Sequence, residues 1–302
     1  MVVSPRSVTF GILIAGGLLA GVAGFAKWRQ TRAFDQPQQL LARFPAEEAI
    51  VLNADLSLLR AAGYPGASKA PLEAEYKQFV EGSGFDYRRD LDHAIASFSA
   101  SGNYFIARGR FNWPKLRLYA VKQGGSCYQD LCRMQGSTPD RRISFLPLRP
   151  DLIAIAVSTD DLAATRLMQA GTEPTAALPA SPVWLTIPGS LLRKPDGMPG
   201  GLRVMFSGLV QADRVVFTLG PAAAGIEARM EAACKSDEEA RVLVGQLRNS
   251  MALMKEAETR GKVDSGALAK ALMGGAFQQE GRRVTGKWPV AKDLLDSLTA
   301  GL

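Results

Sequence analysis

The stretch "IVLNADLSLLR" (residues 50–60) returns without gaps as "VWLTIPGSLLR" (residues 183–193). Both stretches begin with an apolar run typical of a strand and end in Ser-Leu-Leu-Arg, which favours a turn or a short helix. After each stretch come a hairpin pattern and then a strand that runs into a capped helix, in the same order. We therefore expect two divergent copies of one α+β module, each with a mainly antiparallel sheet and helices on one face.

Hairpin patterns are the second feature that the two halves share. Apolar runs joined by turn residues predict hairpins over residues 94–110 and 203–219. If the halves are copies, these hairpins occupy equivalent places beside the strands expected at 49–54 and 182–187.

Helix signals lie between these strands. Residues 70–84 favour a helix that is closed by glycine, and Asn112 stands where it caps a helix with Pro114 in the first turn. Ser158 and Ser236 are each followed three residues later by an acid, the pattern of a capping box, so each predicts the start of a helix.

An apolar segment near the N-terminus is the strongest single signal. Residues 8–26, "VTFGILIAGGLLAGVAGFA", carry no charge and would make a helix about 28 Å long, close to the hydrocarbon thickness of a bilayer. Trp28 and three basic residues follow, as they do at membrane interfaces. We expect a transmembrane signal anchor that contacts the lipid bilayer, with the alternative of a signal peptide cleaved after Gly24-Phe25-Ala26.

Small residues line one side of this segment. Gly17 and Gly21 form a G-x-x-x-G pattern that Ala20 and Gly24 extend, so another transmembrane helix could approach closely there. The order of segments gives the expected domains: a cytoplasmic head (1–7), the anchor (8–26), a juxtamembrane connector (27–45), a first α+β module (46–170), a Pro-rich linker (171–181) and a second module (182–302).

The orientation of the body is argued from charge and from resemblance, which disagree. Three basic residues directly after the anchor and one before it favour a cytoplasmic body. The short head and the resemblance described below favour export. We expect a single-pass protein of the inner membrane with an extracytoplasmic, periplasmic body.

Charge is nearly balanced outside the N-terminal region. The chain of 302 residues has a net charge of +7, but four basic residues and no acid lie in the first 32 residues. The remaining 32 basic and 29 acidic residues include no long basic run. A body of this kind is a poor binder of nucleic acid, and we expect no nucleic-acid partner.

Three cysteines are too few for a disulfide scaffold. Cys127 and Cys132 lie too far apart for a disulfide if they share one extended strand, and within reach if the four residues between them turn. A structural disulfide and two unpaired buried thiols are therefore both open. Cys234 ends an apolar stretch and is expected to be a core residue.

No catalytic, cofactor-binding or metal-binding constellation emerges from the sequence. His93 is the only histidine, and no nucleophile can be assigned to it. Residues 281–288, "GRRVTGKW", approach a phosphate-binding loop, but Trp288 stands where Ser or Thr should hold magnesium, and the segment favours a strand. We expect no cofactor and no metal.

One family resemblance adds to these observations. An N-terminal anchor, "RFPAEEAIVLNADLSLLR" and "FIARGRFNWPKL" resemble uncharacterised bacterial membrane-anchored proteins with extracytoplasmic α+β domains, over about residues 44–170. The resemblance implies an exported domain and no reaction. We expect a non-catalytic, membrane-tethered interaction, accessory or scaffold protein with a membrane or extracytoplasmic protein partner; the alternative is a tethered hydrolase without a recognisable motif.

Overall fold

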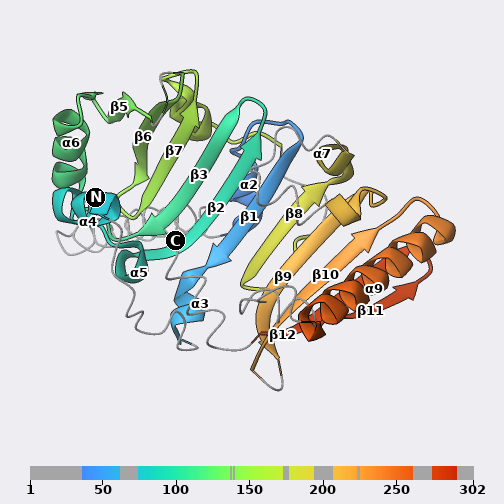
Figure 1. Cartoon of the computed structure of the whole chain (residues 1–302). Helices are drawn as coiled ribbons and strands as arrows, with labels where there is room; N and C mark the ends of the chain where they lie inside the picture. The colour runs from blue at the N-terminus through green and yellow to red at the C-terminus, as the bar shows by residue number, and fades with distance from the viewer. Residues whose placement is uncertain are drawn as a thin grey trace, which may run out of the picture.

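The fold is described from a computed structural model for residues 36–61, 74–136, 138, 140–172, 177–193, 207–222, 225–260 and 274–290. Its strands form one continuous antiparallel sheet in the order β11-β12-β10-β9-β8-β1-β2-β3-β7-β6-β5-β4 (Figure 1). Two modules with separate sheets were expected, and that expectation is wrong because β1 (Ala49–Asp55) pairs directly with β8 (Val183–Pro188).

The two sequence stretches that echo each other are these two central strands. Leu52 stands opposite Leu185 in the register, and the same two residues are matched in the sequence alignment. Outward from this pair, strand order is β1-β2-β3-β7-β6 on one side and β8-β9-β10-β12-β11 on the other. Each side therefore places its elements in the same order around the central pair, within a single sheet.

The remaining strands are β2 (Leu91–Ser99), β3 (Gly102–Gly109), β4 (Ser126–Tyr128), β5 (Leu131–Gln135), β6 (Arg142–Arg149), β7 (Leu152–Ser158), β9 (Arg214–Ala222), β10 (Gly225–Ala233), β11 (Ala276–Glu280) and β12 (Arg283–Val290). The helices are α2 (Pro37–Leu41), α3 (Leu56–Ala61), α4 (Ala74–Ser83), α5 (Tyr87–Asp90), α6 (Trp113–Lys122), α7 (Gly189–Arg193) and α9 (Asp237–Thr259), with 3-10 turns η1 (Ala163–Met168) and η3 (Ser207–Leu209).

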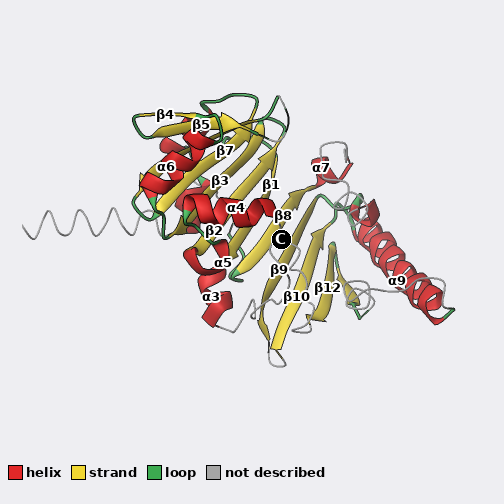
Figure 2. Ribbon diagram, turned by 60° about the vertical axis from the view of Figure 1, so that its left-hand side comes forward, coloured by secondary structure: helices red, strands yellow, loops and turns green. Residues whose placement is uncertain are grey.

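Helices cover both faces of the sheet, so the expectation of helices on one face is also wrong. Successive strand residues point to opposite faces, and near β3 this produces two cores. Ala107, with α6 above it, belongs to one core, while Ile106 belongs to the other, which Leu40 of α2 and Leu167 of η1 close. At the far end of the sheet α9 packs along β11 and β12 (Figure 2).

Several local predictions are confirmed. The helix expected over 70–84 is α4. Asn112 caps α6 by accepting a hydrogen bond from the Lys115 backbone N–H at 3.1 Å. Ser236 accepts from the Glu239 N–H at 3.1 Å at the start of α9. The hairpin expected at 94–110 is β2-β3.

Two local predictions are wrong. The second hairpin is β9-β10, and of the residues expected to form it, 203–219, only those from Arg214 on are in a strand of that hairpin. Leu209, at the end of η3, and Ala212, in the loop that follows, instead fill the core. The hairpin turns at Gly225, whose φ of 124° favours glycine. After Ser158, which ends β7, the chain forms the short 3-10 turn η1 and not a regular helix.

The membrane prediction must also be corrected. In the described parts of the chain, no helix combines the length and the apolar character needed to cross a bilayer. The structure therefore does not support a single-pass inner-membrane protein. The segment 8–26, with Gly17, Ala20, Gly21 and Gly24, lies outside the described residues.

Candidate functional site

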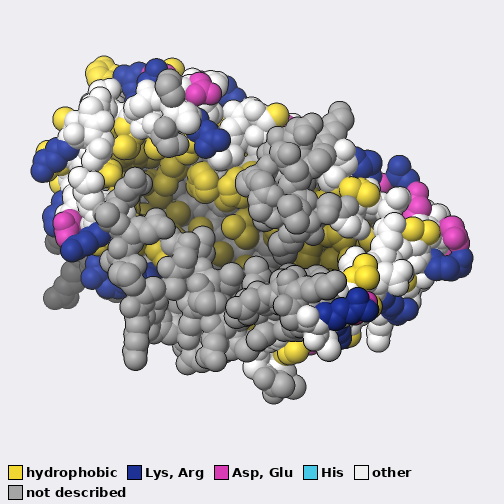
Figure 3. Space-filling view, in the orientation of Figure 1, with side chains coloured by type: hydrophobic (Ala, Val, Ile, Leu, Met, Phe, Trp, Pro, Cys, Tyr) yellow, Lys and Arg dark blue, Asp and Glu magenta, His cyan; other side chains and the backbone are white. Residues whose placement is uncertain are grey.

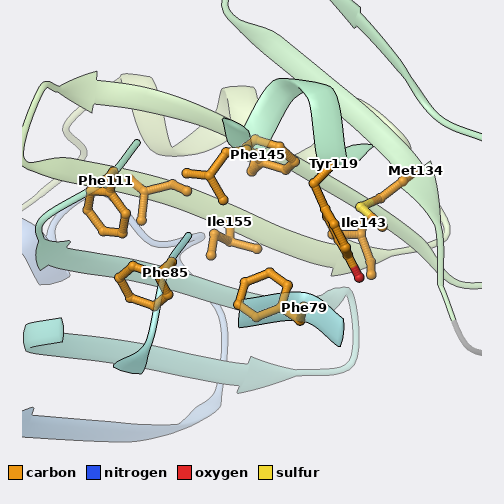
Figure 4. Close-up of a pocket in the computed structure, with 10 residues that line it drawn as sticks. Phe79, Phe85, Phe111, Tyr119, Met134, Ile143, Phe145 and Ile155 are labelled. Carbon is orange, nitrogen blue, oxygen red and sulfur yellow. The ribbon is translucent and has the colours of Figure 1, made fainter. Parts of the chain in front are cut away.

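An apolar cavity of about 270 Å³ lies between the sheet and the helices α4 and α6 (Figure 4). Its walls come from strands β5, β6 and β7, from the two helices and from the loops at their ends. None of the described side chains that line it is charged. They are Phe79, Phe85, Phe111, Leu116, Tyr119, Met134, Ile143, Phe145, Ile153 and Ile155.

The strand register explains why so many apolar side chains face this cavity. Phe145 pairs with Ile155 across β6 and β7, and Met134 pairs with Ile143 across β5 and β6. Paired residues point to the same face, and so do residues two apart on one strand. The alternation of apolar residues in three neighbouring strands therefore creates one apolar floor. Figure 3 shows the hydrophobic side chains gathered in a hollow of this face, with Lys and Arg at its rim.

A chain of aromatic contacts forms the helical side of the cavity. Phe79 of α4 meets Tyr119 of α6 edge to face, with ring centroids 5.3 Å apart. Phe85 stacks on Phe111 at 5.2 Å and 18°. Figure 4 shows this stacked pair at one end of the cavity and Met134 with Tyr119 at the other. Such pairs add about 0.5–1.5 kcal/mol each beyond area burial, so the wall is well ordered.

Gly82 allows α4 and α6 to approach. A Cβ atom at this position would lie 2.7 Å from Cδ2 of Tyr119, closer than real Cβ contacts. The absence of a side chain therefore sets how near the Tyr119 ring comes to α4.

Asp90 holds the loop that carries Phe85. Its carboxylate accepts hydrogen bonds from the Arg89 side chain at 3.0 and 2.9 Å, from the Asp86 N–H at 3.0 Å and from Arg110 Nε at 3.4 Å. These bonds, with the one from Arg89 foremost, lower the pKa of Asp90 to about 2. Gly109 lets the Asp90 carbonyl approach, because a Cβ there would lie 2.2 Å from that oxygen.

A second network ties α4 to the same loop. The Tyr76 hydroxyl donates to Asp86 at 2.8 Å and accepts from the Tyr87 N–H at 3.1 Å. Burial and the hydrogen bond to Asp86 raise the pKa of Tyr76. The Arg88 guanidinium lies 5.9 Å from the centre of the Tyr76 ring, within cation–π range. The loop is therefore anchored at both ends by side chains that do not line the cavity.

The structure joins Cys127 and Cys132 in a disulfide, which is one of the two alternatives left open by the sequence. The two cysteines face each other in the β4-β5 hairpin. Cys132 is fully buried in the core beside the cavity, together with Leu116 and Phe145. Cys234, by contrast, is a free buried thiol in the other core, as expected.

His93 does not form a catalytic pair. Its Nε2 lies 2.8 Å from Oδ1 of Asn53, a buried amide whose Nδ2 donates to the Pro182 carbonyl at 3.1 Å. Burial lowers the pKa of His93, Asp55 opposes this change and Arg108 adds to it. The histidine of β2 is thus hydrogen-bonded to β1, whose Asn53 in turn binds the chain just before β8.

Other chemistry considered from the sequence is not found. Residues 281–288 form the turn at Gly281 and strand β12, as the strand interpretation predicted. Within the described residues, no three His, Cys, Asp or Glu side chains gather as metal ligands would.

A groove also lies beside η1. Leu162 and Met168 are exposed there, and so is Tyr128 at the tip of the β4-β5 hairpin. Sequence reasoning predicted neither the apolar cavity nor this groove, because the walls of both come from segments far apart in the chain.

No protein-family model and no curated protein matches the sequence. Among solved structures, the chain is similar to TP0453 in crystal form III, with 10% identity, 87% of this chain and 98% of that chain covered, and a TM-score of 0.48. Crystal form I of TP0453 gives 11% identity, 86% and 96% coverage, and a TM-score of 0.46. These scores are too low for a conclusion about this chain. The family resemblance and the protein partner stay predictions.

Proposed function

We propose that this protein is a non-catalytic binding protein whose site is the apolar cavity under α4 and α6. The observation that carries the proposal is the lining: ten side chains, none charged, enclosing about 270 Å³. Ligand sites are concave and mainly apolar, with few polar groups. An engineered cavity of about 150 Å³ already binds benzene, so this volume accommodates a larger apolar molecule.

The surroundings support binding rather than catalysis. The Tyr119 hydroxyl is the one hydroxyl among the lining side chains, and the lining has no carboxylate, imidazole or thiol that could serve as nucleophile or base. His93, the only histidine of the chain, is hydrogen-bonded to Asn53 and does not line the cavity. Three paired strands, the helices α4 and α6 and the disulfide-linked hairpin hold the walls of the cavity.

Fluorescence of N-phenyl-1-naphthylamine, a neutral probe that brightens in apolar surroundings, tests this proposal. The matched pair of variants is Leu116→Phe and Leu118→Phe on α6. Leu116 lines the cavity and is 6% exposed, whereas Leu118 is 52% exposed. We expect saturable binding that Leu116→Phe weakens at least tenfold and Leu118→Phe leaves unchanged.

Met134→Phe fills the cavity from the opposite wall. It replaces Leu116→Phe as the cavity-filling variant if circular dichroism shows that Leu116→Phe does not fold. Absence of saturable binding to the wild-type protein would contradict the proposal. So would equal binding by folded cavity-filling variants and the Leu118→Phe control.

A further inference from the structure

The apolar cavity has a charged neighbour. A wider cavity of about 640 Å³ shares Phe111 with it as a common wall. The neighbour is lined by Arg89, Asp90, Arg110, Trp113 and Asp151, with other residues of the same loops. The stacked Phe85–Phe111 pair therefore stands where apolar surroundings give way to charged ones.

The described lining of this charged cavity contains two arginines, Arg89 and Arg110, and two acids, Asp90 and Asp151. Asp90 is shared by Arg89 and Arg110, and Asp151 is shared by Arg149 at 2.7 Å and Arg108 at 4.0 Å. Because Arg149 and Arg108 pair with Asp151 from outside the lining, Arg89 and Arg110, whose guanidinium groups stay protonated, share the single negative charge of Asp90.

Two of the arginines are accessible to a ligand. The side chains of Arg89 and Arg110 are 69% and 62% exposed, while the Asp90 carboxylate between them is 8% exposed. A guanidinium has five N–H donors, so contact with Asp90 leaves donors for a second anion. The accessible part of this cavity is therefore its positive part.

We infer that the ligand of the apolar cavity is an amphiphile, with one apolar chain in the apolar cavity and an anionic head, a carboxylate or a phosphate, at Arg89 and Arg110. This inference rests on the proposed function. The volume of 270 Å³ corresponds to about nine volumes of about 30 Å³, the share of one water in the liquid. If each carbon of the chain occupies about one such volume, a chain of about nine or ten carbons fills the cavity and brings its head to the common wall at Phe111.

Displacement of bound N-phenyl-1-naphthylamine at low salt tests the inference. The competitors are decanoate, decyl phosphate, 1-decanol and decyltrimethylammonium, which share the chain and differ in the head, and inorganic phosphate, which has no chain. We expect the two anions to displace the probe at a concentration at least tenfold lower than the alcohol. The cation should compete more weakly than the alcohol, and inorganic phosphate should not displace the probe. The better of the two anions identifies the head.

The variant Arg89→Gln/Arg110→Gln should reduce the anion preference to less than about threefold while probe binding persists. Arg241→Gln/Arg283→Gln is the control, because it removes the same charge from exposed pairs with Glu238 and Glu231 in the other half. If the double variant loses the probe through unfolding, the single variants Arg89→Gln and Arg110→Gln each serve instead.

The two proposals fail in different ways. Equal displacement by decanoate and decanol, or an anion preference that the Arg89 and Arg110 variants retain, would overturn the inference and leave the apolar site standing. Failure of the probe to bind the wild-type protein would instead remove the proposed function.

Discussion

Replacing Asp90 by Asn tests whether one buried carboxylate holds the wall of the cavity. Asp90 is 5% exposed, and its pKa is lowered from 3.8 to about 2 by the bond from Arg89 and its other partners. That difference corresponds to about 2 kcal/mol at about 1.4 kcal/mol per pH unit. Because Arg89 and Arg110 are themselves largely exposed and screened, we expect Asp90→Asn to lower the free energy of unfolding by about 1–2 kcal/mol at pH 7.

The pH dependence of this loss has a definite sign. The folded-state pKa lies below the unfolded value, so the stabilisation is fully present above pH 3.8 and is lost as the pH falls from 3.8 towards 2. Urea denaturation measures this dependence, with wild type and variant compared at pH 7 and at the lowest pH at which both proteins fold. The difference between the two proteins should shrink on acidification.

A matched control is Asp161→Asn, since Asp161 pairs with Arg133 at 3.3 Å but is 49% exposed. We expect it to change stability by less than about 0.5 kcal/mol. If Asp90→Asn costs no more than this control, or if its cost does not depend on pH, the Asp90 carboxylate does not hold the loop as described.

Two further predictions concern His93, at the contact between β2 and β1, and the disulfide of the β4-β5 hairpin. Burial lowers the pKa of His93, so on acidification the histidine takes up its proton in the unfolded chain before it does so in the folded protein. The free energy of unfolding should therefore fall as the pH drops below 6.5, by at most about 1.4 kcal/mol per pH unit. Urea titrations at pH 7.5 and 5.5 should show a smaller fall for His93→Gln than for the wild type, and equal falls would refute this. Reduction of the Cys127–Cys132 disulfide should lower the free energy of unfolding by about 2 kcal/mol, as expected for so short a loop. Denaturation with and without dithiothreitol measures this loss, and a Cys127→Ser/Cys132→Ser variant should not respond to the reductant.

Local structure was largely predictable because local rules decide it. The cap at Asn112, the start of α9 at Ser236 and the hairpin β2-β3 follow from residues a few positions apart. The hairpin expected over 203–219 was wrong because burial in a core formed by distant segments outweighed the local strand pattern. Leu209 and Ala212 are in an apolar run that resembles a strand, yet they enter the core from the 3-10 turn η3 and from the loop after it.

The sequence by itself determined the order of the elements and the two matched stretches at 50–60 and 183–193, and it limited Cys127 and Cys132 to two possible states, between which the structure decided. Only the tertiary structure decided that β1 and β8 pair with each other, which turns two expected sheets into one. The cavity is also a tertiary property, because Phe79, Phe111 and Ile155 reach it from three elements far apart in the chain. Strand alternation determines which side chains share a face, but no local pattern records which strands become neighbours or which helix covers them.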